Sequence, residues 1–384
     1  MKKNQLNRIL IILVIVLANF SCQPTAKTEI PYSVLKTENF QKTVDGKPTN
    51  LYFLVNGDVR MAVTNYGGRI VSLCTPDKDG KYADIVLGFK SIDDYLDANE
   101  VFHGATIGRV ANRIADGKFT LDSVEYVLPI NNKTNQLHGG KDGFHNQVWD
   151  VELVNDTSIV LTYFSKDGEM SYPGNLDVEV TYCLTPDNEL VISYEAETDK
   201  RTPVMLTNHA FWNLGGEGSG TINDHILTIN ADSCIRIDST LIPTGEIAPV
   251  EGTVFDFREG KPVGQDLAKQ GENEQLQNGK GYDYNWPIKK GKSGKMTFAG
   301  SITDPKSGRE MEVYTEEPVL LFYGGNFLSG KDVGKYGITF KYREAFCLET
   351  QHYPDSPNHD NFPSIILEPG EKYQTRSVYK FSIQ

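Results

Sequence analysis

Two of the seven histidines stand in the least ordinary segments of this 384-residue chain, and a carboxylate lies far downstream of both. His138 lies in 135–140 (NQLHGG), His209 in 207–214 (TNHAFWNL) and Glu349 in 347–351 (CLETQ). Imidazoles and a carboxylate held among glycine, asparagine and aromatic residues suit proton transfer on a polar ligand. A lone histidine more often packs in a core or lies on a surface. The remaining histidines are therefore compared with these two: His103 and His145 have similarly glycine-flanked positions, and His225, His352 and His359 have weaker surroundings.

Three further segments carry side chains suited to a polar ligand. Segment 108–114 (GRVANRI) offers Asn112 and Arg113, whose donors suit sugar hydroxyls; the alternative is a structural arginine paired with a carboxylate. Segment 281–286 (GYDYNW) places Asp283 between two tyrosines. Phe211 and Trp212 beside His209 could offer an aromatic face to the apolar side of a sugar ring, or could be core residues. The glycines after His138 would let backbone come close to a ligand.

The elements that must position these residues are predicted to be strands. Apolar residues alternate with polar ones over 176–184 and again over 190–196, and the turn 185–188 between them predicts a hairpin. Trp149 and Val151 begin a second such pair, which returns through 159–163. Segment 342–351 is predicted as a strand with Phe346 and Leu348 on one side and Cys347 and Glu349 on the other. The pattern predicts an all-β fold with few short helices, forming one large antiparallel domain over 30–384.

Helical signals are few. Ser91 followed by Asp94 predicts one short capped helix, and the polar stretch 260–280 is expected to be a loop with one helical turn rather than a domain linker.

The first 22 residues are predicted to be an export signal. Lys2, Lys3 and Arg8 precede an apolar run of ten residues at 9–18, which is shorter than the roughly 20 residues of a membrane-spanning helix. Cys22 then predicts a lipoprotein signal, lipidated at that thiol, although Asn19 and Phe20 are atypical before it. The alternative is ordinary cleavage near this point. We expect an exported protein with residues 23–29 as a tether and with membrane contact only through the lipid.

The composition excludes some classes of partner and site. A net charge of −13 argues against nucleic acid, which needs a basic face. The cysteines after Cys22 form no CxxC pair and no cluster with histidine, so no metal site is predicted. Whether any of them form disulfides stays open, with buried free thiols as the alternative: Cys74, Cys183, Cys234 and Cys347.

Taken together and in order, the segments resemble the aldose 1-epimerase (galactose mutarotase) family. The matching motifs span essentially the whole mature chain: GRVANRI (108–114), NQLHGG (135–140), TNHAFWNL (207–214), GYDYNW (281–286), FYGGNFL (322–328), CLETQHYPDSPN (347–358) and FPSIILEPGEKY (362–373). The resemblance implies a β-supersandwich that interconverts the α and β anomers of a free monosaccharide, without metal or organic cofactor. Leu321 stands where members commonly have a glutamine, which puts one sugar contact in doubt.

The resemblance also implies roles for individual residues. Glu349 would be the general base and His209 the general acid; Asn112, Arg113, His138 and Asp283 would bind hydroxyls and the ring-oxygen region. Opening the ring requires removal of the C1 hydroxyl proton and delivery of a proton to the ring oxygen. We expect Asp283 and Glu349 to favour the charged form of His209, and Arg113 to keep Glu349 ionised.

Two other functions stay open on the sequence. A glycoside hydrolase needs two carboxylates beside the scissile bond, which Asp283 and Glu349 could supply. A non-catalytic sugar-binding protein on the cell surface would keep the pocket but would have no need for an acid–base pair.

Overall fold

The computed structural model describes residues 34–289 and 295–384. The predicted signal (1–22), with Cys22, and the predicted tether (23–29) therefore lie outside the described residues. The described residues are mostly strands, as predicted, and all the pairings between their named strands are antiparallel. None of their helices combines the length and the apolar character needed to cross a membrane.

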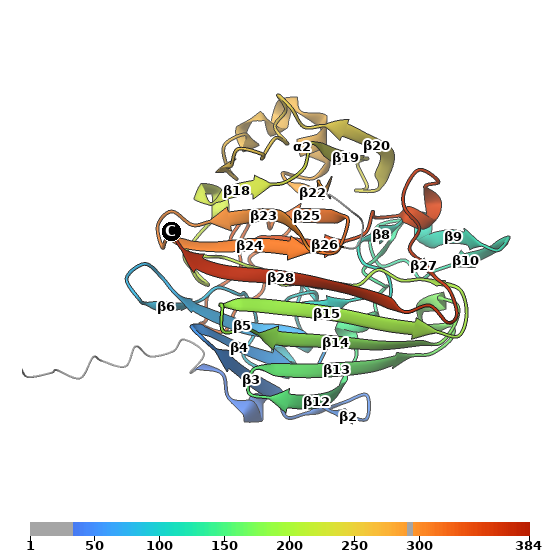
Figure 1. Cartoon of the computed structure of the whole chain (residues 1–384), viewed down its shortest axis with the longest axis horizontal. Helices are drawn as coiled ribbons and strands as arrows, with labels where there is room; N and C mark the ends of the chain where they lie inside the picture. Colours follow the sequence, from blue (N-terminus) through green and yellow to red (C-terminus); the bar gives the residue numbers. More distant parts are fainter. Residues whose placement is uncertain (1–33, 290–294) are drawn as a thin grey trace, which may run out of the picture.

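A nine-stranded sheet runs through the molecule (Figure 1). Its strands, in spatial order, are β12 (Asp150–Asn155), β13 (Ser158–Ser165), β14 (Leu176–Leu184), β15 (Glu189–Thr198), β28 (Tyr373–Ile383), β24 (Arg309–Thr315), β23 (Thr297–Thr303), β18 (Ile226–Ile229) and β21 (Lys261–Pro262). The two predicted hairpins are β12–β13 and β14–β15. In β14 the even-numbered residues from Leu176 to Leu184 are buried, whereas Asp177 is exposed and the other odd-numbered residues are partly exposed. This alternation arises because successive side chains of a strand point to opposite faces.

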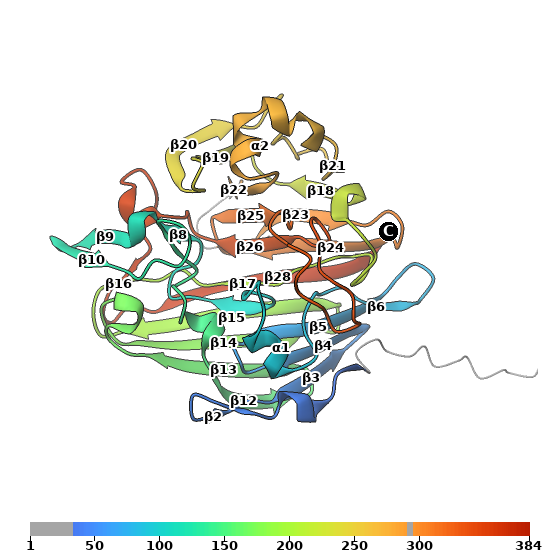
Figure 2. The same cartoon turned by 180° about the vertical axis from the view of Figure 1, so that it is seen from behind.

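Smaller sheets cover one face of this large sheet, as the view from behind shows (Figure 2). A four-stranded sheet contains β3 (Leu51–Asn56), β4 (Val59–Thr64), β5 (Arg69–Pro76) and β6 (Tyr82–Asp84); a three-stranded sheet contains β22 (Asp283–Pro287), β25 (Val319–Tyr323) and β26 (Cys347–Gln351); and β7 (Ala105–Ile107) pairs with β17 (Thr207–His209). The main apolar core between the layers contains residues from Leu54 to Phe381. The division of the chain into one domain over 30–384 stays a prediction. A core shared by the layers is consistent with it.

The remaining elements are short. Two-stranded pairs are β1 (Thr43–Val44) with β2 (Lys47–Pro48), β8 (Arg113–Ile114) with β11 (Gln136–Leu137), β9 (Lys118–Leu121) with β10 (Val124–Val127), β16 (Thr202–Pro203) with β27 (Ile366–Leu367), and β19 (Ser233–Ile237) with β20 (Pro243–Pro249). The α-helices are α1 (Ile92–Leu96) and α2 (Glu274–Asn278), and 3-10 turns span Thr37–Phe40, Ala115–Gly117, Phe144–Asn146, Glu169–Ser171, Ile222–Asp224, Leu267–Glu272 and Ser356–Asn358.

Three local predictions can be compared with these bounds. The capped helix is confirmed, because the Ser91 side chain accepts a hydrogen bond from the Asp94 backbone N–H at the start of α1. Segment 260–280 contains α2, a 3-10 turn and the short strand β21, so it is more ordered than predicted. The predicted strand over 342–351 begins only at Cys347, because Arg343 has a left-handed φ of 62° and forms a turn before it.

Candidate active site

The predicted binding and catalytic residues line one pocket of about 710 Å³. Those that line it are Asn112, Arg113, His138, His209, Asp283, Leu321 and Glu349. Some of them are more than two hundred residues apart in the sequence, and the fold brings all of them to one cavity.

The three-stranded sheet supplies one wall of this pocket. Glu349 lies in the middle of β26, and Leu321 on β25 is its partner across the strand pair. Asp283 begins β22 and is paired with Tyr323 of β25. Because directly paired residues point to the same face of a sheet, Leu321 places an apolar side chain beside the Glu349 carboxyl.

His138 is held by a tight loop on another side of the pocket. It has a left-handed φ of 53°, and its Nδ1 accepts a hydrogen bond of 3.1 Å from the Asn112 backbone N–H. Gly139 follows with a φ of +80°, and a Cβ added there would lie 2.0 Å from the carbonyl oxygen of Gly108. The close approach expected at this glycine is therefore to the chain's own backbone and not to a ligand.

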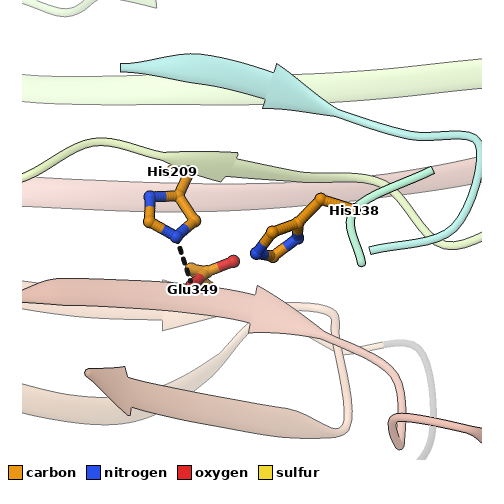
Figure 3. A group of neighbouring side chains, drawn as sticks. All are labelled: His138, His209 and Glu349. Atoms are coloured by element: carbon orange, nitrogen blue, oxygen red, sulfur yellow. Dashed lines mark ion pairs between the residues drawn. The ribbon is translucent and has the colours of Figure 1, made fainter. Parts of the chain in front are cut away.

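His209 ends β17 and faces Glu349 across the pocket (Figure 3). Its Nε2 lies 3.5 Å from Glu349 Oε1, and the two residues are 5% and 1% exposed. Figure 3 also shows a ring nitrogen of His138 directed at the same carboxyl group. A proton donor, a proton acceptor and a third polar group thus converge on a small volume.

Burial sets the protonation of this group. It lowers the pKa of His209 to about 4, and the positive charges of Arg113 and Arg69 act in the same direction. It raises the pKa of Glu349 well above the usual range; Asp283 adds to the rise and Arg113 opposes it. The expectations that neighbouring carboxylates keep His209 charged and that Arg113 keeps Glu349 ionised are therefore wrong, because loss of solvation outweighs both effects.

The same three side chains are the candidate metal ligands. One nitrogen or oxygen atom from each of His138, His209 and Glu349 lies within 4.8 Å of the others, and two histidines with a carboxylate are a common ligand set. His138, however, is neutral, because burial places its pKa well below the usual range. A backbone N–H can only donate, so Nδ1 of His138 must hold the lone pair and Nε2 the hydrogen. With Nε2 protonated, His138 is a fixed donor toward the pocket and does not fit a metal.

Several pocket residues carry no signal in the sequence. Phe102 packs its ring 4.7 Å from both the His138 and His145 rings and 5.7 Å from the His209 ring. Arg69 donates to the carbonyl oxygens of His103 and His145. Lining residues outside the motifs include Tyr66, Arg69, Tyr95, Glu100, Phe102 and Lys280, whereas Tyr323 and Phe327 lie in the FYGGNFL motif but had no predicted role. They lie on strands, on α1 and in loops from separate parts of the fold, and only the assembled layers bring them to the pocket.

The aromatic pair beside His209 belongs to the core. Phe211 is fully buried behind the His209 ring, at 4.9 Å, and is not among the pocket-lining residues. Trp212 is stacked on Tyr379 in the main core. Of the two interpretations of Phe211 and Trp212, the structure supports core residues and not a stacking face. The aromatic side chains that do line the pocket are Tyr66, Tyr95, Phe102, Tyr323 and Phe327.

The remaining histidines, Arg109 and the cysteines also differ in whether they lie at the pocket. His145 lines the pocket, whereas His103 is buried beneath it against Phe211, and His225, His352 and His359 lie outside its lining. Arg109 is structural and donates to the carbonyl oxygens of Pro173 and Gly174. The four cysteines in the described residues are free thiols, which settles the open question of disulfides: Cys74, Cys183, Cys234 and Cys347.

A layered β-sandwich that gathers an imidazole and a carboxyl group 3.5 Å apart, with a fixed donor and an arginine in the same pocket, defines an enzyme that moves protons on a small polar ligand. The comparisons with known proteins specify which enzyme class this is. The family model for aldose 1-epimerase matches residues 50–380. Galactose mutarotase of Rattus norvegicus is 43% identical over 351 residues, which cover 91% of this chain and 99% of the rat protein. Aldose 1-epimerase of Escherichia coli (strain K12) is 36% identical over 341 residues, which cover 88% and 96%.

Solved structures agree with the fold. The crystal structure of an aldose epimerase homologue from C. elegans superimposes with a TM-score of 0.80 at 33% identity, covering 87% of this chain and 99% of that one. A galactose 1-epimerase structure from Lactobacillus acidophilus gives 0.77 at 28% identity, covering 89% and 97%. The chain belongs to the aldose 1-epimerase family and is an isomerase of the mutarotase class. The predicted galactose mutarotase-like β-supersandwich is confirmed.

Proposed function

We propose that this enzyme opens and recloses the ring of a free aldose with Glu349 as general base and His209 as general acid. The observation that supports these roles is the approach of His209 Nε2 to Glu349 Oε1, 3.5 Å, inside the pocket. The relatives' names support galactose as the first sugar to assay, with glucose as a second aldose.

The protonation states that burial favours are compatible with these roles. A neutral imidazole beside a neutral carboxyl group holds as many protons as an imidazolium beside a carboxylate. One proton transfer from Glu349 to His209 Nε2 therefore produces the catalytic ion pair without exchange with solvent. Arg113, whose charge favours the carboxylate, supports this state when the sugar displaces water.

The reaction then proceeds by two coordinated transfers. Glu349 removes the proton of the C1 hydroxyl while His209 delivers a proton to the ring oxygen, and the C1–O bond to the ring oxygen breaks. Rotation about C1–C2 exposes the other face of the aldehyde, and reclosure reverses both transfers. No covalent intermediate is formed. The Nε2–H of His138 and the Arg113 guanidinium supply donors for the sugar oxygens, and Asp283 and Asn112 supply acceptors.

The test is polarimetric mutarotation of α-glucose and α-galactose by Glu349→Gln and His209→Asn. Because a positioned acid or base contributes about 10²–10⁴-fold, each substitution is expected to lower kcat by at least about 10²-fold. His359→Asn, outside the pocket, is the matched control, and circular dichroism checks that all variants are folded. Near-normal kcat in either site variant would show that the assigned roles are wrong.

The same protein preparation separates the two alternatives. Release of new reducing ends from an oligosaccharide would support a hydrolase with Asp283 and Glu349 as its carboxylates. Sugar binding without any rate enhancement would support a binding protein. Rapid equilibration of anomers, with the oligosaccharide left intact, is the result that we expect.

We further propose that the protein is exported and lipidated at Cys22. This proposal rests on the sequence alone, on the basic start and the apolar run before Cys22. A lipidated chain should fractionate with membranes and show a diacylated N-terminal cysteine by mass spectrometry, whereas Cys22→Ser should be recovered unlipidated. Mass spectrometry of a mature chain that begins elsewhere and carries no lipid would contradict it.

A further inference from the structure

The imidazole of His209 has a second neighbour on its far side, the thiol of Cys347. The distance from His209 Nδ1 to Cys347 Sγ is 3.5 Å, within hydrogen-bond range for sulfur. Cys347 is fully buried and is a free thiol. Cys347 and Glu349 are two residues apart on β26, so their side chains lie on the same face of that strand. One strand therefore contacts both nitrogens of the His209 ring.

The direction of the hydrogen bond follows from what each nitrogen must do. A general acid that acts through Nε2 alternates between an imidazolium and a neutral ring whose remaining hydrogen is on Nδ1. That hydrogen needs an acceptor throughout the cycle, since an unpaired buried N–H is costly. A thiol sulfur can accept it. The carbonyl oxygen of His209 itself also interacts with the ring and favours its protonated form. Among the ring nitrogens only Nδ1 can reach that carbonyl, and a carbonyl only accepts, so it too requires a hydrogen on Nδ1.

We propose that Cys347 is a positioning residue, whose sulfur accepts the Nδ1–H of His209 and so makes Nε2 the nitrogen that exchanges a proton with the sugar. This inference rests on the proposed role of His209. Burial raises the pKa of the Cys347 thiol well above its usual range, so the group stays neutral. A neutral acceptor orients the ring without adding the negative charge that would hold the proton on it too firmly for an acid.

The experiment compares Cys347→Ala, which removes the acceptor, with Cys347→Ser, which replaces it by a hydroxyl. Cys234→Ala is the matched control, since Cys234 is also a fully buried free thiol on a strand but lies in the main core away from His209. Cys347→Ala leaves the Nδ1–H with only the carbonyl oxygen of its own residue as acceptor, which is expected to lower kcat by about tenfold with KM nearly unchanged. Cys347→Ser should keep most of the activity, and Cys234→Ala should keep all of it.

The pH profile provides a readout that a purely structural role would not change. A better acceptor for the charged ring raises the pKa of His209 and a lost acceptor lowers it, so the acid limb of kcat should move up in Cys347→Ser and down in Cys347→Ala. The other groups that face His209 are the same in both variants: Arg69, His103, Arg113, His138, His145, Tyr323 and Glu349.

Nitrogen-15 NMR of histidine-labelled protein gives the tautomer directly, with His209→Asn used to assign the signal. The expected result is a hydrogen on Nδ1 in the wild type and a changed tautomer ratio in Cys347→Ala. A wild-type hydrogen on Nε2 overturns the proposal, as does a Cys347→Ala variant with wild-type kcat and pH profile. If His209→Asn is inactive while Cys347→Ala is normal, only this inference fails; if His209→Asn is itself active, the proposed function fails first.

Discussion

The His209–Glu349 pair is governed by burial, and this has a consequence for the dependence of activity on pH. The pair shares one exchangeable proton, which lies on Glu349 while His209 is neutral and on His209 Nε2 after the internal transfer. Below the pKa of His209, about 4, both groups are protonated and no base remains. An exposed histidine would lose its neutral form already near pH 6.5.

We therefore expect kcat/KM, which reports the groups of the free enzyme, to stay level as the pH falls from 7 to about 5 and to decline only near pH 4. The measurement is the enzymatic rate of mutarotation after subtraction of the buffer-catalysed rate, with folding monitored by circular dichroism at each pH. A decline centred near 6.5 in protein that is still folded would mean that His209 titrates as a solvated group and that its burial has been overstated.

Residue types could be predicted from the sequence better than residue environments. His138, His209, Asp283 and Glu349 were identified correctly as pocket residues because their motifs are unusual and occur in a fixed order. The protonation state of His209 could not be predicted in this way, because its solvation depends on which distant side chains cover it. Phe211 failed for the same reason: an aromatic residue next to a histidine has the same sequence pattern whether it faces a ligand or the core.

At the scale of elements, the alternation over 342–351 predicts that Cys347 and Glu349 share a face, and both side chains contact the His209 ring. The contact from that face to His209 joins residues 138 positions apart and could not be predicted from either local pattern. The conformation of the loop after His138 could not be predicted from the sequence either. The glycines after His138 are expected to lie against a ligand, but a Cβ added at Gly139 would meet the backbone of Gly108, and one added at Gly140 would meet the side chains of Met170 and Gln136.

The loop after β11 gives a prediction at this scale. In Gly139→Ala the new Cβ would meet the Gly108 carbonyl oxygen at 2.0 Å and would also strain a backbone with φ of +80°. Gly168→Ala is the matched control, since its φ is +83° but nothing lies within 4 Å of the added atom. Both variants carry the backbone strain, and only the first must displace the loop that holds His138.

We expect Gly168→Ala to lower the free energy of unfolding by about 1 kcal/mol with normal kinetics, as for other left-handed glycines. Gly139→Ala should lose more stability than this and should also raise KM several-fold, because the Nε2–H of His138 moves. Urea unfolding and mutarotation kinetics measure the two effects. Equal stability losses with an unchanged KM would show that the loop accommodates the methyl group without moving His138.

The whole molecule depends on contacts that join its separate sheets. The pocket takes Glu349 and Asp283 from the three-stranded sheet, and His209 from β17; Arg69 lies at the start of β5 and Glu100 in the loop before β7. Composition and net charge, which describe the whole chain, argue against nucleic acid as a partner but carry no information on this assembly. The segment between β25 and β26 shows how the layers are joined, through one buried lysine.

Lys335 lies fully buried in that segment and contacts two carboxylates. Its Nζ is 3.2 Å from Asp84 Oδ2 at the end of β6 and 3.1 Å from Glu217 Oε2 in the segment after β17, and it donates to the carbonyl oxygens of Val71 and Val86. Lys335→Met would keep the side-chain volume and remove the charge. Two carboxylates would then remain buried without a counter-ion, which typically costs about 3–5 kcal/mol.

We expect Lys335→Met to lower the free energy of unfolding by that amount, measured as a lower urea midpoint with an unchanged m-value, and to lower the yield of active enzyme without changing its KM. Lys306→Met, which removes an exposed partner of Asp224, is the control and should unfold like the wild type. The triple variant Asp84→Asn, Glu217→Gln, Lys335→Met should recover much of the loss, because the buried charges are removed together. If the triple variant were no more stable than Lys335→Met, the loss would come from the broken contacts to Val71 and Val86 rather than from unpaired charge.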